Sequence, residues 1–98
     1  MLLHIGENMG IPLERVLFVL NERGIMPTTR AFVNRARRER RYVGCAGKPK
    51  SYVIVSEHGR EVVHASMIAS ATLEKRWREE ICRRYLNEAA VLTVTDDA

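Results

Sequence analysis

The strongest constraint on the fold is a pair of apolar segments on either side of a short polar gap. Residues Ser51 to Val55 and Glu61 to Ala65 are rich in β-branched side chains, and Glu57 to Arg60 lie between them. Segments of this composition are typical of strands, and a gap of this length is typical of a hairpin connection. The sequence therefore predicts an antiparallel hairpin.

Two further strands are expected before the hairpin. Residues 1–5 are mostly apolar and predict a short strand closed by Gly6. Residues 13–22 allow two interpretations, because the apolar run Val16 to Leu20 fits a buried strand, whereas apolar residues at helical spacing followed by Gly24 fit a helix. The shortness of the run and its branched and aromatic content favour the strand.

A basic helix is expected from Thr29 to Tyr42. A threonine hydroxyl after Pro27 can accept an unpaired backbone N–H at the start of the helix. Helical spacing places three apolar residues on one side, Arg40 towards that side, and an arginine ridge on the opposite side. The apolar side holds Phe32, Val33 and Ala36, and the ridge holds Arg30, Arg37 and Arg41.

A second helix is expected after Ser70, with Leu73, Trp77, Ile81 and Tyr85 at steps of four. The fold class is therefore α+β: one domain over residues 1–90, a small antiparallel sheet, a basic central helix and a C-terminal helix. Residues 91–98 form a tail, with either a strand or an acidic end over 91–97. The expected core is Leu3, Ile5, Val16, Phe18, Phe32, Ala36, Val53, Val55, Val63, Leu73 and Trp77.

Length and composition exclude several classes of protein. The chain has 98 residues, and its longest apolar run is far shorter than the ~20 residues of a membrane span. The N-terminus lacks the features of a signal peptide, and Cys45 and Cys82 make neither a disulfide framework nor a zinc site. We therefore expect a cytoplasmic protein without a cofactor, a metal, a membrane partner or a small-molecule substrate.

Candidate catalytic groups are few. The three histidines, His4, His58 and His64, fall on separate elements, and Cys45 is more simply a small residue in a turn than a reactive thiol. Residues 44–48 contain two glycines and a lysine, but they lack the spacing of a phosphate loop. The sequence therefore favours a binding protein over an enzyme.

The positive charge is concentrated in one part of the chain. Residues 30–50 carry eight bases and one acid, a net charge of +7, whereas the other residues sum to −3. Within this segment, Gly47-Lys48-Pro49-Lys50-Ser51 predicts a compact basic turn that leads into a strand, with both ammonium groups pointing outward. Lysines bind phosphate as point charges, so the segment indicates a polyanionic partner.

Four segments in the same order resemble the RemA/RemB family of bacterial extracellular-matrix regulators, and the RemB branch most of all. They are LHIG with IP a few residues later, TTRAFVNRARRE, GKPKSYVIV and SMIASATLEKRW, and together they span about Met1 to Trp77. The resemblance implies an α+β subunit that assembles into a closed homo-oligomeric ring and activates biofilm-matrix genes by binding DNA through a repeated basic loop. Lys48 and Pro49 stand where RemA proteins have an arginine pair, and Lys50 adds a base one step later.

The leading hypothesis is a DNA-binding transcriptional regulator that acts as a ring-like homo-oligomer on double-stranded DNA. Its expected phosphate contacts are Lys48 and Lys50, with Arg30, Arg37, Arg38 and Arg41 as auxiliary contacts. The alternative is a homo-oligomeric scaffold in which these arginines form salt bridges with Glu74, Glu79, Glu80 and Glu88 of other subunits. RNA binding is a third possibility, with few aromatic side chains near the basic segment to support it.

Overall fold

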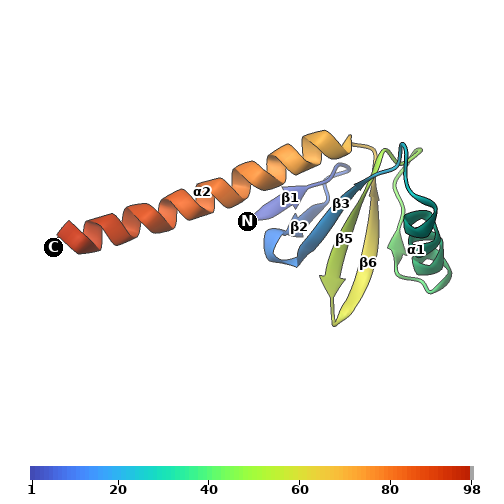
Figure 1. Cartoon of the computed structure of the whole chain (residues 1–98), viewed down its shortest axis with the longest axis horizontal. Helices are drawn as coiled ribbons and strands as arrows, with labels where there is room; N and C mark the ends of the chain where they lie inside the picture. Colours follow the sequence, from blue (N-terminus) through green and yellow to red (C-terminus); the bar gives the residue numbers. More distant parts are fainter. Residues whose placement is uncertain (98) are drawn as a thin grey trace.

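The computed structural model describes the backbone of residues 1–97 and the side chains of residues 1–86, and it has three layers. A four-stranded sheet is covered on one face by helix α1 and on the other by a small hairpin and the first part of helix α2 (Figure 1). The elements are β1 (Leu2–His4), β2 (Gly10–Pro12), the 3-10 turn η1 (Leu13–Arg15), β3 (Val16–Asn21), α1 (Pro27–Arg38), β4 (Tyr42–Val43), β5 (Ser51–Glu57), β6 (Arg60–Ser66) and α2 (Ser70–Asp97).

The main sheet has the strand order β3-β5-β6-β4. The expected hairpin is confirmed as β5 and β6, and its turn is tighter than the sequence suggested, because Glu57 pairs with Arg60. His58 and Gly59 both have positive φ angles, the conformation that two-residue hairpin turns require. Residues 16–21 form strand β3 along β5, which settles the open choice in favour of a strand.

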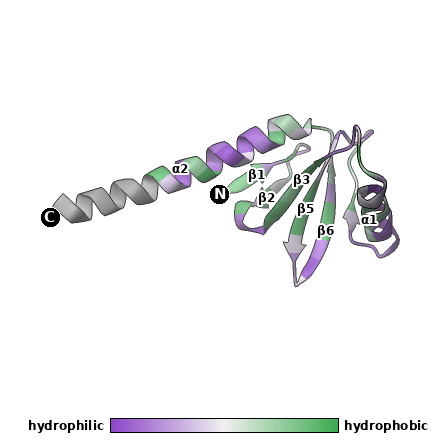
Figure 2. Ribbon diagram, viewed as in Figure 1, coloured by the Kyte–Doolittle hydropathy of each residue, from purple (hydrophilic) through white to green (hydrophobic). Residues whose placement is uncertain are grey.

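The α+β class is confirmed, although one strand pair of the sheet is parallel. Strand β4 runs parallel to β6, and β1 pairs with β2 in a separate two-stranded sheet. One part of the core lies under this small hairpin and includes Leu3, Val53 and Leu73, and the other lies under α1 and includes Val33 and Ile54. Figure 2 shows the central strands as mostly hydrophobic, as two covered faces require.

Helix α1 begins earlier and ends earlier than expected. Pro27 occupies the first turn, where its missing N–H costs nothing, and no threonine side chain caps the helix. The helix ends because Arg40 adopts a left-handed φ of 60°. The Arg41 N–H then donates to the Ala36 carbonyl at 2.8 Å and the Arg40 N–H donates to the Arg37 carbonyl at 3.3 Å, which is the Schellman arrangement.

This ending makes the predicted arginine ridge wrong. Arg41 lies beyond the helix and is 9% exposed, and Arg40 is exposed at the turn instead of facing the apolar side. Tyr42, expected to be helical, begins strand β4. The helix therefore carries fewer of the basic side chains than its sequence pattern suggested.

Other expectations are corrected by the packing. Phe18, placed in the core by its sequence, is 59% exposed, because β3 is an edge strand and no further strand covers its outer side. His64 is buried, and its Nε2 lies 3.3 Å from Glu57 Oε1. Helix α2 continues to Asp97, so a strand over residues 91–97 is excluded.

Candidate nucleic-acid interface

The first arginine of the basic segment is held within its own chain. Arg30 on α1 donates one guanidinium hydrogen bond to Glu22 and another to the Tyr52 hydroxyl, 3.5 Å away. The hydrogen bond from Arg30 holds the pKa of Glu22 below its usual value, with a smaller contribution from Tyr52. Burial raises the pKa of Tyr52 to about 12. Arg30 therefore belongs to a structural cluster.

Arg41 is engaged even more fully. Its Nη1 donates to the Glu61 carbonyl at 2.6 Å, and its Nε donates to Glu39 Oε1 at 3.1 Å. The hydrogen bond from Arg41 lowers the pKa of Glu39. Because the guanidinium of Arg41 is buried and bound to the carboxylate and the carbonyl, its predicted role as a DNA contact finds no support in this geometry.

The other arginines near the end of α1 are exposed, and they differ in what their side chains contact. The guanidinium carbon of Arg37 lies 4.5 Å from the centre of the Tyr42 ring, a cation–π distance. Arg38 and Arg40 are exposed, and among the described residues neither forms a salt bridge. This end of the molecule keeps a modest basic surface, which we call the arginine end and define as Arg37, Arg38 and Arg40.

The loop between β4 and β5 is fixed from several sides. The Lys50 N–H donates to the Ser66 carbonyl at 2.8 Å, and the Lys50 carbonyl accepts from the Glu22 N–H at 3.1 Å. At its start, the Ala46 N–H donates to Glu7 Oε1 at 2.6 Å, and the Cys45 thiol donates to the Gly47 carbonyl at 3.2 Å. The loop is therefore held in place by its backbone, which leaves its side chains available.

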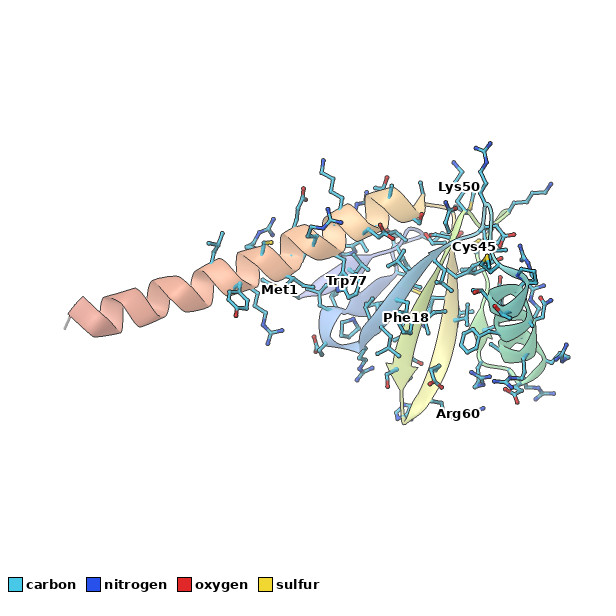
Figure 3. All side chains as sticks on the ribbon, viewed as in Figure 1. Met1, Phe18, Cys45, Lys50, Arg60 and Trp77 are labelled. Atoms are coloured by element: carbon cyan, nitrogen blue, oxygen red, sulfur yellow. The ribbon has the colours of Figure 1, made fainter. Side chains whose placement is uncertain are left out.

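Lys48 and Lys50 are exposed, as the sequence predicted, and the Lys50 side chain points away from the sheet (Figure 3). The nearby acids Glu7 and Glu22 are already occupied, by Ala46 and Arg30. The structure adds the exposed residue Arg23, which lies close to the loop because the backbone N–H of its neighbour Glu22 donates to the Lys50 carbonyl. Arg23, Lys48 and Lys50 have no salt-bridge partner within residues 1–86, and we call them the lysine end.

The sequence did not indicate Arg23, because it lies outside the charged segment and next to an acid. Only the pairing of β3 with β5 brings the turn after β3 beside the loop. A turn residue that follows an apolar run, Arg23 before Gly24, is the one signal that could have suggested exposure.

The two basic ends are well separated. Arg41 is bonded at Glu61 and Lys50 at Ser66, so the two attachment points are five residues apart on β6, about 17 Å along a strand. Figure 3 accordingly labels Lys50 and Arg60 at opposite ends of the hairpin. The continuous basic segment of the sequence is divided into two surfaces by the fold.

Other chemistry is sparse in the part of the chain that is described. Within it, no three histidine, cysteine or acidic side chains are grouped so that they could hold a metal ion. Across residues 1–97, no helix has the length and apolar character that crossing a membrane demands. No family model matches the sequence, and the search of curated proteins gives no match.

Proposed function

We propose that the chain is a cytoplasmic DNA-binding regulator that contacts phosphates of the duplex through the lysine end. One observation carries the proposal: Arg23, Lys48 and Lys50 are three exposed cations on a rigidly held edge, while the carboxylates beside them are bonded to other groups. Exposed cations without a salt-bridge partner favour binding of a polyanion, because no carboxylate of the protein neutralises their charge and the backbone holds them in place.

The resemblance to the RemA/RemB family supports the rest of the proposal. In a ring-like homo-oligomer the lysine end would be repeated around one face, and linked weak sites bind a continuous phosphate chain far more tightly than one site does. A single subunit with three phosphate contacts would bind DNA weakly. We therefore include the regulation of extracellular-matrix genes, and a ring as the functional form, in the proposal.

The test is duplex binding by the wild type and by two variants that are matched in charge. Fluorescence anisotropy with a labelled duplex compares the wild type, Lys48→Ala/Lys50→Ala and Arg38→Ala/Arg40→Ala, each measured at the same low salt concentration. Both variants lose two positive charges, so only the position of the loss differs. We expect the lysine variant to lose at least tenfold in affinity and the arginine variant to lose much less. Equal losses would contradict the assignment of the lysine end.

The scaffold alternative makes a different forecast for the same experiment. In a scaffold held by salt bridges between subunits, the wild type would show no affinity for the duplex even at this low salt concentration. Arg30 and Arg41 argue against this alternative, because each is bonded to a carboxylate of its own subunit, Glu22 and Glu39. The acids of α2 named as partners are therefore not needed to neutralise them.

A further inference from the structure

The outer edge of the sheet at β3 is unusual for a protein surface. β3 pairs only with β5, so its other side is open, and its residues from Val16 to Leu20 contain neither a charge nor a proline. Edge strands are normally protected by charged residues, proline or a covering element, because an open apolar edge recruits another strand. Apart from the register shift between Val16 and Phe18, this edge lacks such protection, which indicates a surface that is covered in the functional protein.

Apolar side chains on the edge strand are also exposed. Phe18 is 59% exposed and Leu17 is 39% exposed. Between β3 and α2 lies a groove of about 470 Å³, which Phe18 and Leu20 line from the strand and Trp77 and Ile81 from the helix. A second hollow of about 370 Å³, lined by Phe18, Leu20 and Phe32, opens on the α1 side of the same strand. The edge is therefore apolar on both faces of the sheet.

The apolar stripe of α2 continues beyond the body of the protein. Along this stripe Leu73 is fully buried, Trp77 is half-buried, Ile81 is 44% exposed and Tyr85 is 74% exposed. Figure 1 shows α2 projecting away from the sheet. The apolar stripe of the helix therefore extends past the residues that the rest of the chain covers.

We propose that β3 is the contact surface for a second copy of this chain, whose own β3 pairs with it antiparallel about Phe18. This register places Phe18 opposite the partner's Phe18, Leu17 opposite the partner's Val19, and Val16 opposite the partner's Leu20. Every facing pair is apolar, because the run Val16 to Leu20 has nearly the same character in both directions. A two-fold contact requires this self-complementarity, and cross-strand apolar pairs stabilise it.

The backbone of β3 is prepared for this pairing. The Glu22 N–H donates to the Lys50 carbonyl, and the same register pairs Leu20 with Tyr52 and Phe18 with Ile54. Because hydrogen-bonded pairs alternate in an antiparallel ladder, the N–H and C=O of Val19 point away from β5. Leu17 has no partner residue on β5, since the register shifts by one between Val16 and Phe18. Val19 therefore supplies free backbone groups at a position that the proposed register pairs, and Leu17, opposite it across the two-fold axis, lies at the bulge.

Charge favours another copy of the chain over a polyanion at this surface. The groove contains one acid, Glu74, and one base, Arg78, so it is neutral in a chain with a net charge of +4. Two positively charged copies approach with least repulsion through a neutral surface, and a two-fold contact can place each Glu74 near the partner's Arg78. The inference deepens the oligomeric part of the proposed function, because a two-fold β3 contact joins copies in pairs while closure of a ring uses a second, different contact. It rests on the proposed function only for the need of an assembly, because the lysine end is a separate surface.

The first test measures the mass of the full chain without DNA, by size-exclusion chromatography with light scattering. We expect the wild type to elute as an even multiple of the single-chain mass of 11.2 kDa, and Phe18→Lys to elute with half the wild-type mass or less. Met67→Lys is the matched control, since Met67 is 45% exposed and lines a separate hollow beside Gly44 and Cys45, and we expect it to keep the wild-type mass. A wild type of single-chain mass, or Phe18→Lys at the wild-type mass, would overturn the proposal.

A second variant guards against misfolding. Phe18→Ala removes the exposed ring without adding a charge, and circular dichroism and thermal unfolding verify that both Phe18 variants remain folded. We expect Phe18→Ala to shift the assembly equilibrium in the same direction by at least tenfold. Lys48→Ala/Lys50→Ala should keep the wild-type mass, so failure of the lysine end and failure of the β3 contact give separate results.

Cross-linking tests the register. In a Cys45→Ser/Cys82→Ser background, Phe18→Cys places two thiols opposite each other on the two-fold axis, at a non-hydrogen-bonded position where Cα atoms lie about 4.5 Å apart. We expect a disulfide-linked dimer on oxidation. Leu20→Cys in the same background is the control, because the cysteine at position 20 of the other copy lies four residues further along the strand, about 13 Å away. Cross-linking of Leu20→Cys but not Phe18→Cys would overturn the register.

Discussion

The arginines bonded around α1 and the lysines of the β4–β5 loop belong to one stretch of basic sequence, yet their surroundings differ. Around α1, Arg30 and Arg41 are bonded to Glu22 and Glu39, and Arg37 lies over the Tyr42 ring. At the loop, Lys48 and Lys50 are exposed, and the carboxylates beside them are bonded elsewhere. The number of charges in a segment therefore does not decide which of them can bind a partner. What decides it is the acids that the fold brings close.

The largest effect expected from this comparison is a difference in stability. Arg41→Ala removes a buried guanidinium that binds the Glu61 carbonyl and Glu39, and we expect a loss of about 2 kcal/mol in the free energy of unfolding. Lys50→Ala removes an exposed side chain, and we expect a change within about 0.5 kcal/mol. Urea unfolding of both variants provides the measurement. Equal losses would break the distinction between the bonded arginines and the exposed lysines.

A gain in stability is expected at the turn that ends α1. Arg40 has a φ of 60°, a conformation that glycine adopts without strain and that costs other residues about 1 kcal/mol. Arg40→Gly should therefore raise the free energy of unfolding by up to about 1 kcal/mol, and it should leave duplex affinity nearly unchanged. The same urea titration checks the gain. A destabilised variant would show that the Arg40 side chain makes a contribution larger than the strain.

A pH-dependent effect is expected from the Glu22–Arg30 pair. The pKa of Glu22 is lowered in the folded state, so its contribution to stability is present above its usual value of 4.5 and is lost as the pH falls through the folded pKa. We expect Glu22→Gln to lower the melting temperature at neutral pH and to match the wild type in acid. Thermal melts across pH test this. A difference that persists undiminished in acid would contradict a role for the carboxylate charge.

The smallest effect is spectroscopic and concerns the same cluster. Burial raises the pKa of Tyr52 to about 12. Subtracting the phenolate absorbance of Tyr52→Phe from that of the wild type during alkaline titration should leave a step near this value. A step near 10.0, the ordinary value, would show that the Tyr52 hydroxyl is not enclosed with Arg30 and Glu22.

Much of the fold was open to prediction because it depends on local patterns. The hairpin of β5 and β6, the strand at residues 16–21 and the start of α2 follow from β-branched runs, polar gaps and apolar steps of four. The end of α1 did not, since the Schellman turn uses Arg40 where glycine would have signalled it. Phe18 was misplaced because a sequence does not state which strand lies at the edge of a sheet.

The candidate site was predicted in part. Lys48 and Lys50 were identified from the composition of the loop, and their exposure is confirmed. The hydrogen bonds that hold Arg30 and Arg41 depend on contacts between separate elements, such as Glu22 with Arg30. The closeness of Arg23 to the loop depends on another, between Glu22 and Lys50. Long-range pairing of this kind leaves no periodic signal in a single sequence.

The most direct test of the account is the salt dependence of duplex binding by the wild type and by Lys48→Gln/Lys50→Gln. Each phosphate contact contributes about −0.9 to the slope of log affinity against log salt for duplex DNA. The lysine variant loses two contacts in every subunit that touches the duplex, so the slope should become shallower by about 1.8 for each of these subunits. Arg38→Gln/Arg40→Gln should retain the wild-type slope. An unchanged slope in the lysine variant would contradict the claim that the lysine end meets the phosphates.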